Sequence, residues 1–263
     1  MSASLQPAAL ETRGLTVRFG GHVAVNQVST SFHAGTLTAI VGPNGAGKTT
    51  FFNLVSGQLR ATAGEVLLNG HDISNAAAPT RARLGLGRAF QLTNLFPNLT
   101  VHENVRLAVQ AERGLGLSMW RMSSSARDLA SCADEILNEV ALHSKSSLTA
   151  SVLSHNDQRK LEVALLIALK PSVFMFDEPT AGMSVDEVPV ILDLIRRLKE
   201  DKTKTILLVE HKLDVVRQLA DRIVVLHNGA LVADGAPAEV IASAVVQEAY
   251  LGVRPVAPEA SAT

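Results

Sequence analysis

The segment GPNGAGKTT at residues 42–50 constrains the fold of this chain more strongly than any other. It matches the pattern G-x-x-x-x-G-K-[ST] in full. The apolar run LTAIVG at 37–42 precedes it and predicts a buried strand, and KTTFFNLVSG at 48–57 predicts a helix that ends at Gly57. Because a phosphate-binding loop requires this strand–loop–helix context, the alternative of a glycine-rich turn with a chance lysine is disfavoured.

The chemistry of such a loop suits a nucleoside triphosphate. Its glycines let backbone N–H groups turn inward around phosphate oxygens, and the helix N-terminus adds a partial positive charge. We expect Lys48 to reach the β- and γ-phosphates and Thr49 to ligate Mg²⁺. The expected nucleotide-binding residues of the loop are Gly42, Pro43, Asn44, Gly45, Ala46, Gly47, Lys48, Thr49 and Thr50.

A second motif, VFMFDEP at 173–179, places two acids at the end of a predicted strand. Asp177 suits the metal, either directly or through a water molecule, and Glu178 suits the general base that orients an attacking water. Two acids at the end of a strand more often belong to a solvated turn than to a binding site. The phosphate-loop motif in the same chain favours the nucleotide role here.

Strand-like and helix-like segments alternate along the chain, except in its middle. Residues 92–165 instead show helical periods, with a loose Ser- and Gly-rich patch at 114–127. Alternation of this kind predicts an α/β fold with a mainly parallel sheet covered on both faces. The predicted strands are 15–19, 23–33, 37–42, 64–70, 172–176 and 205–209, a strand and turn are predicted at 222–229, and the predicted helices are 48–57, 188–198 and 212–220.

Composition disfavours several classes of protein. The formal net charge is −1, so no basic excess points to nucleic acid as a partner. Cys132 is the only cysteine, which rules out an intramolecular disulfide. The longest apolar stretch, 161–176, is interrupted by Lys170 and Pro171 and is too short to span a bilayer. A role at a membrane would therefore need a partner protein.

Around these motifs, from about residue 12 to residue 252, the chain resembles the ATP-binding subunits of ABC transporters. Each matching element is weak by itself, but their order and spacing around one phosphate loop make the resemblance specific. The elements are Phe19 at the adenine-stacking position, GRAFQ with Gln91 at the Q-loop, LSHNDQ at the signature, DEPTAGMS at the Walker B acids and D-loop, and LLVEHKLD with His211 at the switch histidine.

The resemblance implies one domain over residues 10–252 and a loose tail at 253–263. It implies a P-loop ATPase core at 10–91 and 166–252, in which an N-terminal antiparallel β part accompanies the mainly parallel sheet. A helical subdomain would occupy about 92–165 and carry the signature.

The resemblance also implies ATP and Mg²⁺ as cofactors and assigns roles to residues. Phe19 would stack on adenine, and Gln91 would join Thr49 and Asp177 around Mg²⁺. Glu178 would polarise the attacking water. His211 would contact the γ-phosphate.

In the family, the signature of one ATPase domain closes on the γ-phosphate held by a second domain. Here that signature corresponds to Ser154, His155, Asn156 and Asp157, which depart from the usual Leu-Ser-Gly-Gly-Gln. His155 and Asn156 replace the glycines, although Asn adopts positive φ more readily than most residues. Asp157 replaces Gln.

Asp157 also introduces a negative charge near the expected phosphate, although some family members carry an acid here. A carboxylate and a phosphate about 8 Å apart repel by roughly 2 kcal/mol at an effective dielectric near 20. A helix N-terminus stabilises an anion by only about 0.3–1 kcal/mol, so it offsets only part of this repulsion. Ser154 and Asp157 also have the spacing of a capping box, which would turn the carboxylate away from a phosphate. We hypothesise that this signature is weak and that a heterodimer partner supplies a better one. Ser184, where many relatives carry Asp, is interpreted as a subtype feature.

Within the family, the chain is most similar to the ATPases of branched-chain (hydrophobic) amino-acid uptake systems. The similarity lies in RFGGHVAVNQVS, LFPNLTVHENVRLA, DEPTAGMS, VEHKLDVV and EAYLG. It implies an ATP-hydrolysing subunit that powers a multi-subunit importer from the cytoplasmic face of the inner membrane. Importers of urea, amides or organic acids share much of this pattern and remain alternatives.

The same resemblance implies the partners. Two membrane-spanning permease subunits would bind near Gln91 and the segment 92–105. A second ABC ATPase subunit would complete the pair, with a heterodimer favoured and a homodimer possible. An extracytoplasmic solute-binding protein would select the solute, and nucleic acid is not expected.

Three competing functions remain within the wider family. A soluble ATPase of translation or DNA repair would usually fuse two ATPase domains or carry zinc or long coiled-coil insertions, so one phosphate loop and one cysteine argue against it. A lipopolysaccharide-export ATPase has the same fold. A non-catalytic regulatory subunit is disfavoured by the complete set of Lys48, Asp177, Glu178 and His211.

Overall fold

The computed structural model describes residues 8–89, 95–115, 119–184, 188–243 and 246. Its strands are β1 Leu10–Phe19, β2 His22–Phe32, β3 Leu37–Val41, β4 Ala63–Leu68, β5 His71–Asp72, β6 Leu86–Ala89, β7 Val173–Asp177, β8 Thr205–Val209, β9 Arg222–His227 and β10 Ala230–Gly235. Its helices are α1 Lys48–Ser56, α2 Ala78–Arg83, α3 Val101–Glu112, α4 Met119–Glu139, α5 His155–Ala168, α6 Val188–Glu200, α7 Leu213–Leu219 and α8 Pro237–Ala242, with 3₁₀ turns η1 His143–Lys145 and η2 Ala150–Val152.

The strands form two sheets of different kinds. One is antiparallel, with the order β2-β1-β4-β5, and the other has six strands in the order β10-β9-β3-β8-β7-β6. In the six-stranded sheet, β9, β3, β8, β7 and β6 run parallel, and β10 pairs antiparallel with β9. β3 lies between β8 and β9, so the loop after it emerges at the carboxyl edge of the sheet, where ligands bind in open α/β folds.

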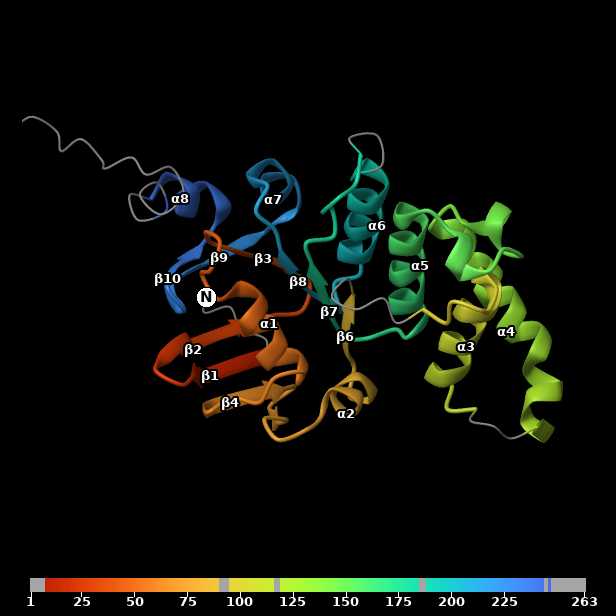
Figure 1. The fold of residues 1–263 in the computed structure, drawn as a ribbon, viewed down its shortest axis with the longest axis horizontal. Helices are drawn as coiled ribbons and strands as arrows, with labels where there is room; N and C mark the ends of the chain where they lie inside the picture. The colour runs from red at the N-terminus through yellow and green to blue at the C-terminus, as the bar shows by residue number, and fades with distance from the viewer. Residues whose placement is uncertain (1–7, 90–94, 116–118, 185–187, 244–245, 247–263) are drawn as a thin grey trace, which may run out of the picture.

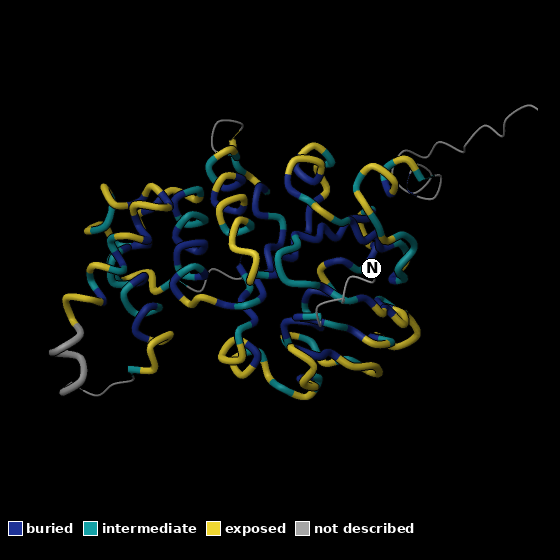
Figure 2. The backbone as a smooth tube through the Cα atoms, turned by 180° about the vertical axis from the view of Figure 1, so that it is seen from behind, coloured by how far each residue is buried: buried dark blue, intermediate teal, exposed yellow. Residues whose placement is uncertain are grey.

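Helix α1 lies between the two sheets (Figure 1). Its Phe51 and Phe52 belong to a buried cluster that also contains Phe32 of the antiparallel sheet and Ile40 and Met175 of the six-stranded sheet. Figure 2 shows the central strands buried along their length, whereas the covering helices expose their outer faces. The two sheets therefore fix the position of the helix that follows the phosphate loop.

Helices α3, α4 and α5 gather at one end of the molecule (Figure 1) and share a core through residues such as Val105, Leu129 and Leu161. Helix α5 packs closely on β6. A Cβ atom on Gly87 of β6 would lie 2.4 Å from Leu166 Cδ1 of α5 and 2.7 Å from Pro171 Cγ, so a larger residue there would require these side chains to move.

The structure confirms the predicted fold, a mainly parallel sheet with an N-terminal antiparallel part and additional helices. The sequence does not predict β5, β6, β10, α2 or α8. β6 escapes prediction because Gly85 and Gly87 flank its first residue, and glycine disfavours strands unless close packing needs it. The predicted tail, 253–263, lies outside the described residues. Within the described part of the chain, no helix combines the length and apolarity needed to cross a membrane.

Candidate nucleotide-binding site

The loop between β3 and α1 is shaped by glycines that no other residue could replace without rearrangement. Gly42 has φ +156° and Gly47 has φ +96°. A Cβ atom on Gly42 would lie 2.2 Å from the carbonyl oxygen of Leu226 in β9, and one on Gly47 would lie 2.5 Å from that of Ala24 in β2. The loop is therefore pressed between the two sheets.

Lys48 bends back across this loop. Its Nζ donates hydrogen bonds to the carbonyl oxygens of Gly42 at 2.7 Å and Pro43 at 3.0 Å. Burial lowers the pKa of its amino group, and the carboxylates of Glu178 and Asp177 oppose part of that shift. The ammonium group thus lies over the space that the loop encloses.

The N-terminus of α1 is open. Its N-cap is Gly47, no side chain caps it, and its first turn carries no acid. The first N–H groups of a helix have no intrahelical acceptor, so they attract anions when nothing else covers them. This helix start can therefore accept a phosphate.

A cavity of about 340 Å³ lies over the loop. Phe19, which is 51% exposed, pairs in the β1–β2 hairpin with His22, one of the residues that line this cavity. The lining residues are His22, Ala24, Asn44, Gly45, Ala46, Gly47, Lys48, Thr49, Thr50 and Glu178. A polar cavity of this size, with an ammonium group and an open helix start, suits a polyphosphate.

Asp177 ends β7 and forms a buried ion pair. Arg88 of β6 donates from Nη2 to Asp177 Oδ2 at 2.7 Å, and the two side chains are 6% and 8% exposed. Arg88 is itself fixed by Asn53 and Ser56 of α1, each at 2.8 Å. Burial raises the pKa of Asp177, and the Arg88 guanidinium opposes part of that rise. The ion pair ties the acid at the strand end to the helix that follows the phosphate loop.

Glu178 has a backbone conformation that is uncommon for a residue with a side chain. Its φ is +50°, and its N–H donates to the carbonyl of Val209 at 3.0 Å. Its Oε1 lies 3.7 Å from His211 Nδ1, with both side chains accessible to solvent. Left-handed backbone at a non-glycine residue stores strain and occurs often at functional sites.

The second predicted site, at residues 154–157, is the start of α5. Ser154 is the N-cap, and its Oγ accepts from the Asp157 N–H at 3.2 Å, which is one half of the expected capping box. The Asp157 carboxylate accepts from Ser154 Oγ at 2.9 Å and from Lys145, and Lys160 lies 3.7 Å away. Burial raises the pKa of Asp157, but its hydrogen bonds with Lys145 and Ser154 and the two lysine charges outweigh burial and leave the pKa below its ordinary value.

Asn156 has a helical backbone as the second residue of α5, so the left-handed conformation considered from the sequence is not used. His155 is exposed, and its Nε2 would lie 3.9 Å from a Cβ atom on Gly182 in the loop after β7. Among the described residues that line the loop cavity, none belongs to 154–157. The structure thus brings the loop, Asp177, Glu178 and His211 together and leaves the start of α5 outside that cluster.

Several residues around the site are absent from the sequence prediction. His22 and Ala24 reach the loop only through the β1–β2 hairpin, and Lys145 reaches Asp157 through the turn η1. Arg88 gave one usable signal, a charged residue inside GRAFQ next to the predicted Q-loop. Gln91 itself lies outside the described residues, as do 92–94 of the predicted permease-contact segment.

The oxygen donors present fit Mg²⁺ as it is usually held in nucleotide sites. Asp177 accepts from Arg88 through Oδ2, and Thr49 is among the residues that line the cavity. Across the described ranges, no group of three His, Cys, Asp or Glu residues could hold a metal ion by itself. Mg²⁺ is commonly bound by one or two protein oxygens together with substrate phosphates, which this arrangement allows.

The sequence matches the ABC transporter family over residues 25–181. It is 36% identical over 251 residues to the high-affinity branched-chain amino acid transport ATP-binding protein LivG of Escherichia coli strain K12, covering 92% of this chain and 97% of that one. BraF of Pseudomonas aeruginosa, with the same description, is 36% identical over 248 residues, with the same coverage. Among solved structures, the ADP conformation of MJ1267, an ATP-binding cassette of an ABC transporter, superposes with a TM-score of 0.79 at 27% identity, covering 94% of this chain and all of that one.

Proposed function

The chain belongs to the ABC transporter family, and on that premise we propose that it powers the import of branched-chain or other hydrophobic amino acids. Relatives that match over 92% of the chain are named for branched-chain amino acid transport, which supports this solute class. The hydrolytic role is carried by one observation: Lys48 and Glu178 line the same polar cavity over the phosphate loop.

In the proposed mechanism, ATP lies with its phosphates in the loop 42–50. Backbone N–H groups and Lys48 stabilise the negative charge of the phosphates, and Phe19 stacks on the adenine. Glu178 accepts a proton from the attacking water and orients it, while His211 contacts the γ-phosphate.

Thr49, Asp177 and Gln91 are the residues that would hold Mg²⁺, which would neutralise charge on the β- and γ-phosphates. Asp177 would supply a carboxylate to the metal or to its water, and Arg88, itself bound to Asn53 and Ser56 of α1, fixes the position of that carboxylate.

A second ABC ATPase subunit would bring its own phosphate loop to Ser154, His155, Asn156 and Asp157. The carboxylate of Asp157 lies in the first turn of the helix whose start would face the γ-phosphate, where it accepts from Ser154 Oγ and pairs with Lys145. A heterodimer is therefore favoured, in which this chain hydrolyses ATP with the partner's signature. A homodimer would have to accommodate two such carboxylates.

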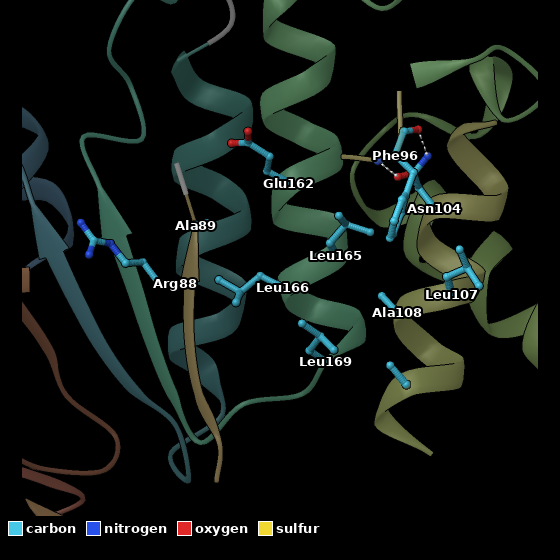
Figure 3. Close-up of a pocket in the computed structure, with 11 residues that line it drawn as sticks. Arg88, Ala89, Phe96, Asn104, Leu107, Ala108, Glu162, Leu165, Leu166 and Leu169 are labelled. Atoms are coloured by element: carbon cyan, nitrogen blue, oxygen red, sulfur yellow. Dashed lines mark hydrogen bonds between the residues drawn. The ribbon is translucent and has the colours of Figure 1, made fainter. Parts of the chain in front are cut away.

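Permease docking is proposed at an apolar cavity of about 360 Å³ between α3, α5 and β6. Leu165 of α5 points toward Phe96 across it (Figure 3), and Leu107 of α3 also lines it. Phe96 is 55% exposed, and Asn104 holds its backbone through hydrogen bonds of 2.8 and 3.1 Å. An exposed apolar cavity in a monomer marks an interaction site.

Glu162 gives this cavity one polar feature. The side chain is buried, and its Oε1 has no hydrogen-bond partner among the described residues. An apolar permease segment with one hydrogen-bond donor would fit. Such docking would hold the chain at the cytoplasmic face of the inner membrane, opposite an extracytoplasmic solute-binding protein.

The first test uses purified Glu178→Gln, which should bind ATP without hydrolysing it. We expect general-base removal to slow turnover by about 100-fold or more. Sizing the variant with and without ATP then separates the oligomers. An ATP-dependent dimer would establish a homodimer and argue against the heterodimer, whereas an ATP-bound monomer would require a second ATPase subunit.

The solute class is tested by uptake of labelled leucine in cells that lack this chain. Uptake should be restored by the wild-type chain and not by Glu178→Gln. Normal leucine uptake in the deleted cells, accompanied by loss of urea or amide uptake, would contradict the proposed class.

A further inference from the structure

A fully buried carboxylate lies directly behind the proposed catalytic pair. Glu210 follows β8, immediately before His211, and none of its surface is exposed. Thr180, two residues after Glu178 and equally buried, donates from Oγ1 to Glu210 Oε1 at 2.7 Å. This hydrogen bond joins the loop after β7 to the loop after β8.

The second oxygen of Glu210 serves the same junction. Oε2 accepts from the backbone N–H of His211 at 3.2 Å and of Lys212 at 3.5 Å. Lys212 Nζ in turn donates to the carbonyl of Thr180 at 3.4 Å. The carboxyl group thus receives one side-chain donor and two backbone donors, so both of its buried oxygens have hydrogen-bond partners.

These bonds act at the position where Glu178 is strained. The carbonyl of Glu178 accepts from Ala181 N at 3.0 Å, so a tight turn begins at Glu178, contains Thr180 and ends at Ala181. A left-handed non-glycine backbone persists only when its surroundings over-determine it. Two side-chain hydrogen bonds tie this turn to the segment of His211: the one from Thr180 to Glu210, which is the shorter, and the one from Lys212 to the Thr180 carbonyl.

We propose that Thr180 and Glu210 are positioning residues that hold Glu178 and His211 in register for hydrolysis. Neither side chain touches the cavity over the phosphate loop, so both act through the backbone of the residues that do. The inference rests on the roles proposed above for Glu178 and His211.

The test compares two substitutions of Thr180 in the full chain. Thr180→Val keeps the shape and removes the hydroxyl, whereas Thr180→Ser keeps the hydroxyl. We expect Thr180→Val to lower kcat by about tenfold or more with KM for ATP changed less than about twofold, because small misplacement of a catalytic group slows chemistry more than binding. Thr180→Ser should retain most of the wild-type kcat.

Thr205→Val is the matched control. Thr205 begins β8, is 1% exposed, and its Oγ1 has no hydrogen-bond partner in the part of the chain that the structure describes. The same chemical change at this other buried threonine, on the strand that leads to Glu210, should leave kcat at the wild-type value. An equal loss in Thr205→Val would overturn the proposal, because any buried Thr→Val change would then suffice.

Other outcomes also decide the matter. Wild-type kcat in folded Thr180→Val, or a Thr180→Ser variant as slow as Thr180→Val, would contradict the positioning role. Should Thr180→Val fail to fold, Glu210→Gln provides the second measurement. Its amide oxygen can still accept from Thr180 while its NH₂ group cannot accept from His211, so kcat should fall and ATP affinity should stay; unchanged kcat would refute the proposal.

Parallel Glu178→Gln and His211→Ala variants separate the two levels of inference. If both turn over ATP at the wild-type rate, the proposed function fails, and the positioning role fails with it. If both are slow and Thr180→Val is not, the positioning role alone is wrong.

Discussion

Two helices of this molecule begin at residues expected to meet phosphate, and they begin in opposite ways. Helix α1 starts at Gly47 with no side-chain cap and no acid in its first turn. Helix α5 starts at Ser154, whose hydroxyl accepts from the N–H of Asp157, and that aspartate lies in the first turn. The first start is open to an external anion. The start of α5 already carries the carboxylate of Asp157 in its first turn.

The two regions also differ in how they hold their acids. Asp177 pairs with Arg88, and both side chains are almost fully buried. Asp157 pairs with Lys145, which is 44% exposed. A helix N-terminus therefore does not define a phosphate site by itself. Two features determine whether the protein or a ligand pairs with the free N–H groups of the helix start. They are the cap residues and how deeply the nearest ion pair is buried.

Replacing Arg88 by Met should have the largest effect on stability. It leaves Asp177 buried without its partner, and breaking a buried ion pair in this way costs about 3–5 kcal/mol. Urea denaturation would measure the free energy of unfolding. Arg13→Met serves as the control. Arg13 pairs with Glu11 at the surface, so this variant should lose little of its free energy of unfolding. A loss from Arg88→Met as small as that of the control would show that the pair contributes nothing special.

Replacing Asp157 by Asn should improve ATP-dependent association in a Glu178→Gln background. Removing an anion about 8 Å from a phosphate relieves up to roughly 2 kcal/mol at an effective dielectric near 20, so the dissociation constant should fall by about tenfold. Analytical ultracentrifugation with ATP, with the partner ATPase subunit added if one is needed, would measure it. Asp193→Asn, where Asp193 pairs with Arg197 on α6, should change nothing. Weaker association on removal of Asp157 would mean that its carboxylate helps to close the site.

Replacing Lys145 by Met should act in the opposite direction and more weakly. It uncovers the charge of Asp157, and half-exposed ion pairs contribute about 0.2–1 kcal/mol. Unfolding free energy should therefore fall by no more than about 1 kcal/mol. ATP-dependent association should also weaken. Tighter association would indicate that Lys145, rather than Asp157, blocks the helix start.

The smallest expected effect is a dependence of stability on pH. The pKa of Asp157 in the folded chain lies below the ordinary value of 3.8, so its contribution is complete above 3.8 and is lost as pH falls through the lower folded pKa. Wild type should therefore lose more stability than Asp157→Asn below pH 3.8. Parallel acid-denaturation curves measure the difference. Superimposable curves would show that Asp157 does not contribute to the dependence of stability on pH.

The phosphate loop could be predicted from sequence because all its determinants are local. Its glycines, Lys48 and the flanking strand and helix patterns lie within about twenty residues. Asp177 and Glu178 were also predictable, since they follow a buried strand. The partner of Asp177 was not, because Arg88 lies 89 residues away in a strand that sequence patterns do not reveal.

The start of α5 shows a different limit. The Ser154 cap was predictable from the spacing of Ser154 and Asp157. The direction of the carboxylate was not, because Lys145 approaches it from a separate 3₁₀ turn, and short turns carry little sequence pattern. Glu210 and Thr180 were missed for a similar reason: their hydrogen bond joins two loops that only the sheet brings together.

The position of β3 has a consequence for the order in which the protein is made. The strand lies between β8 and β9, Gly42 abuts the backbone of Leu226, and Gly229 N donates to the Ala46 carbonyl at 3.0 Å. A ribosome releases the loop residues long before it releases these partners, and contacts so distant in sequence form late. The nascent chain therefore carries the phosphate-loop sequence without the loop. A chain that stops before β8 would lack both neighbours of β3 and the contacts of Leu226 and Gly229 that shape the loop.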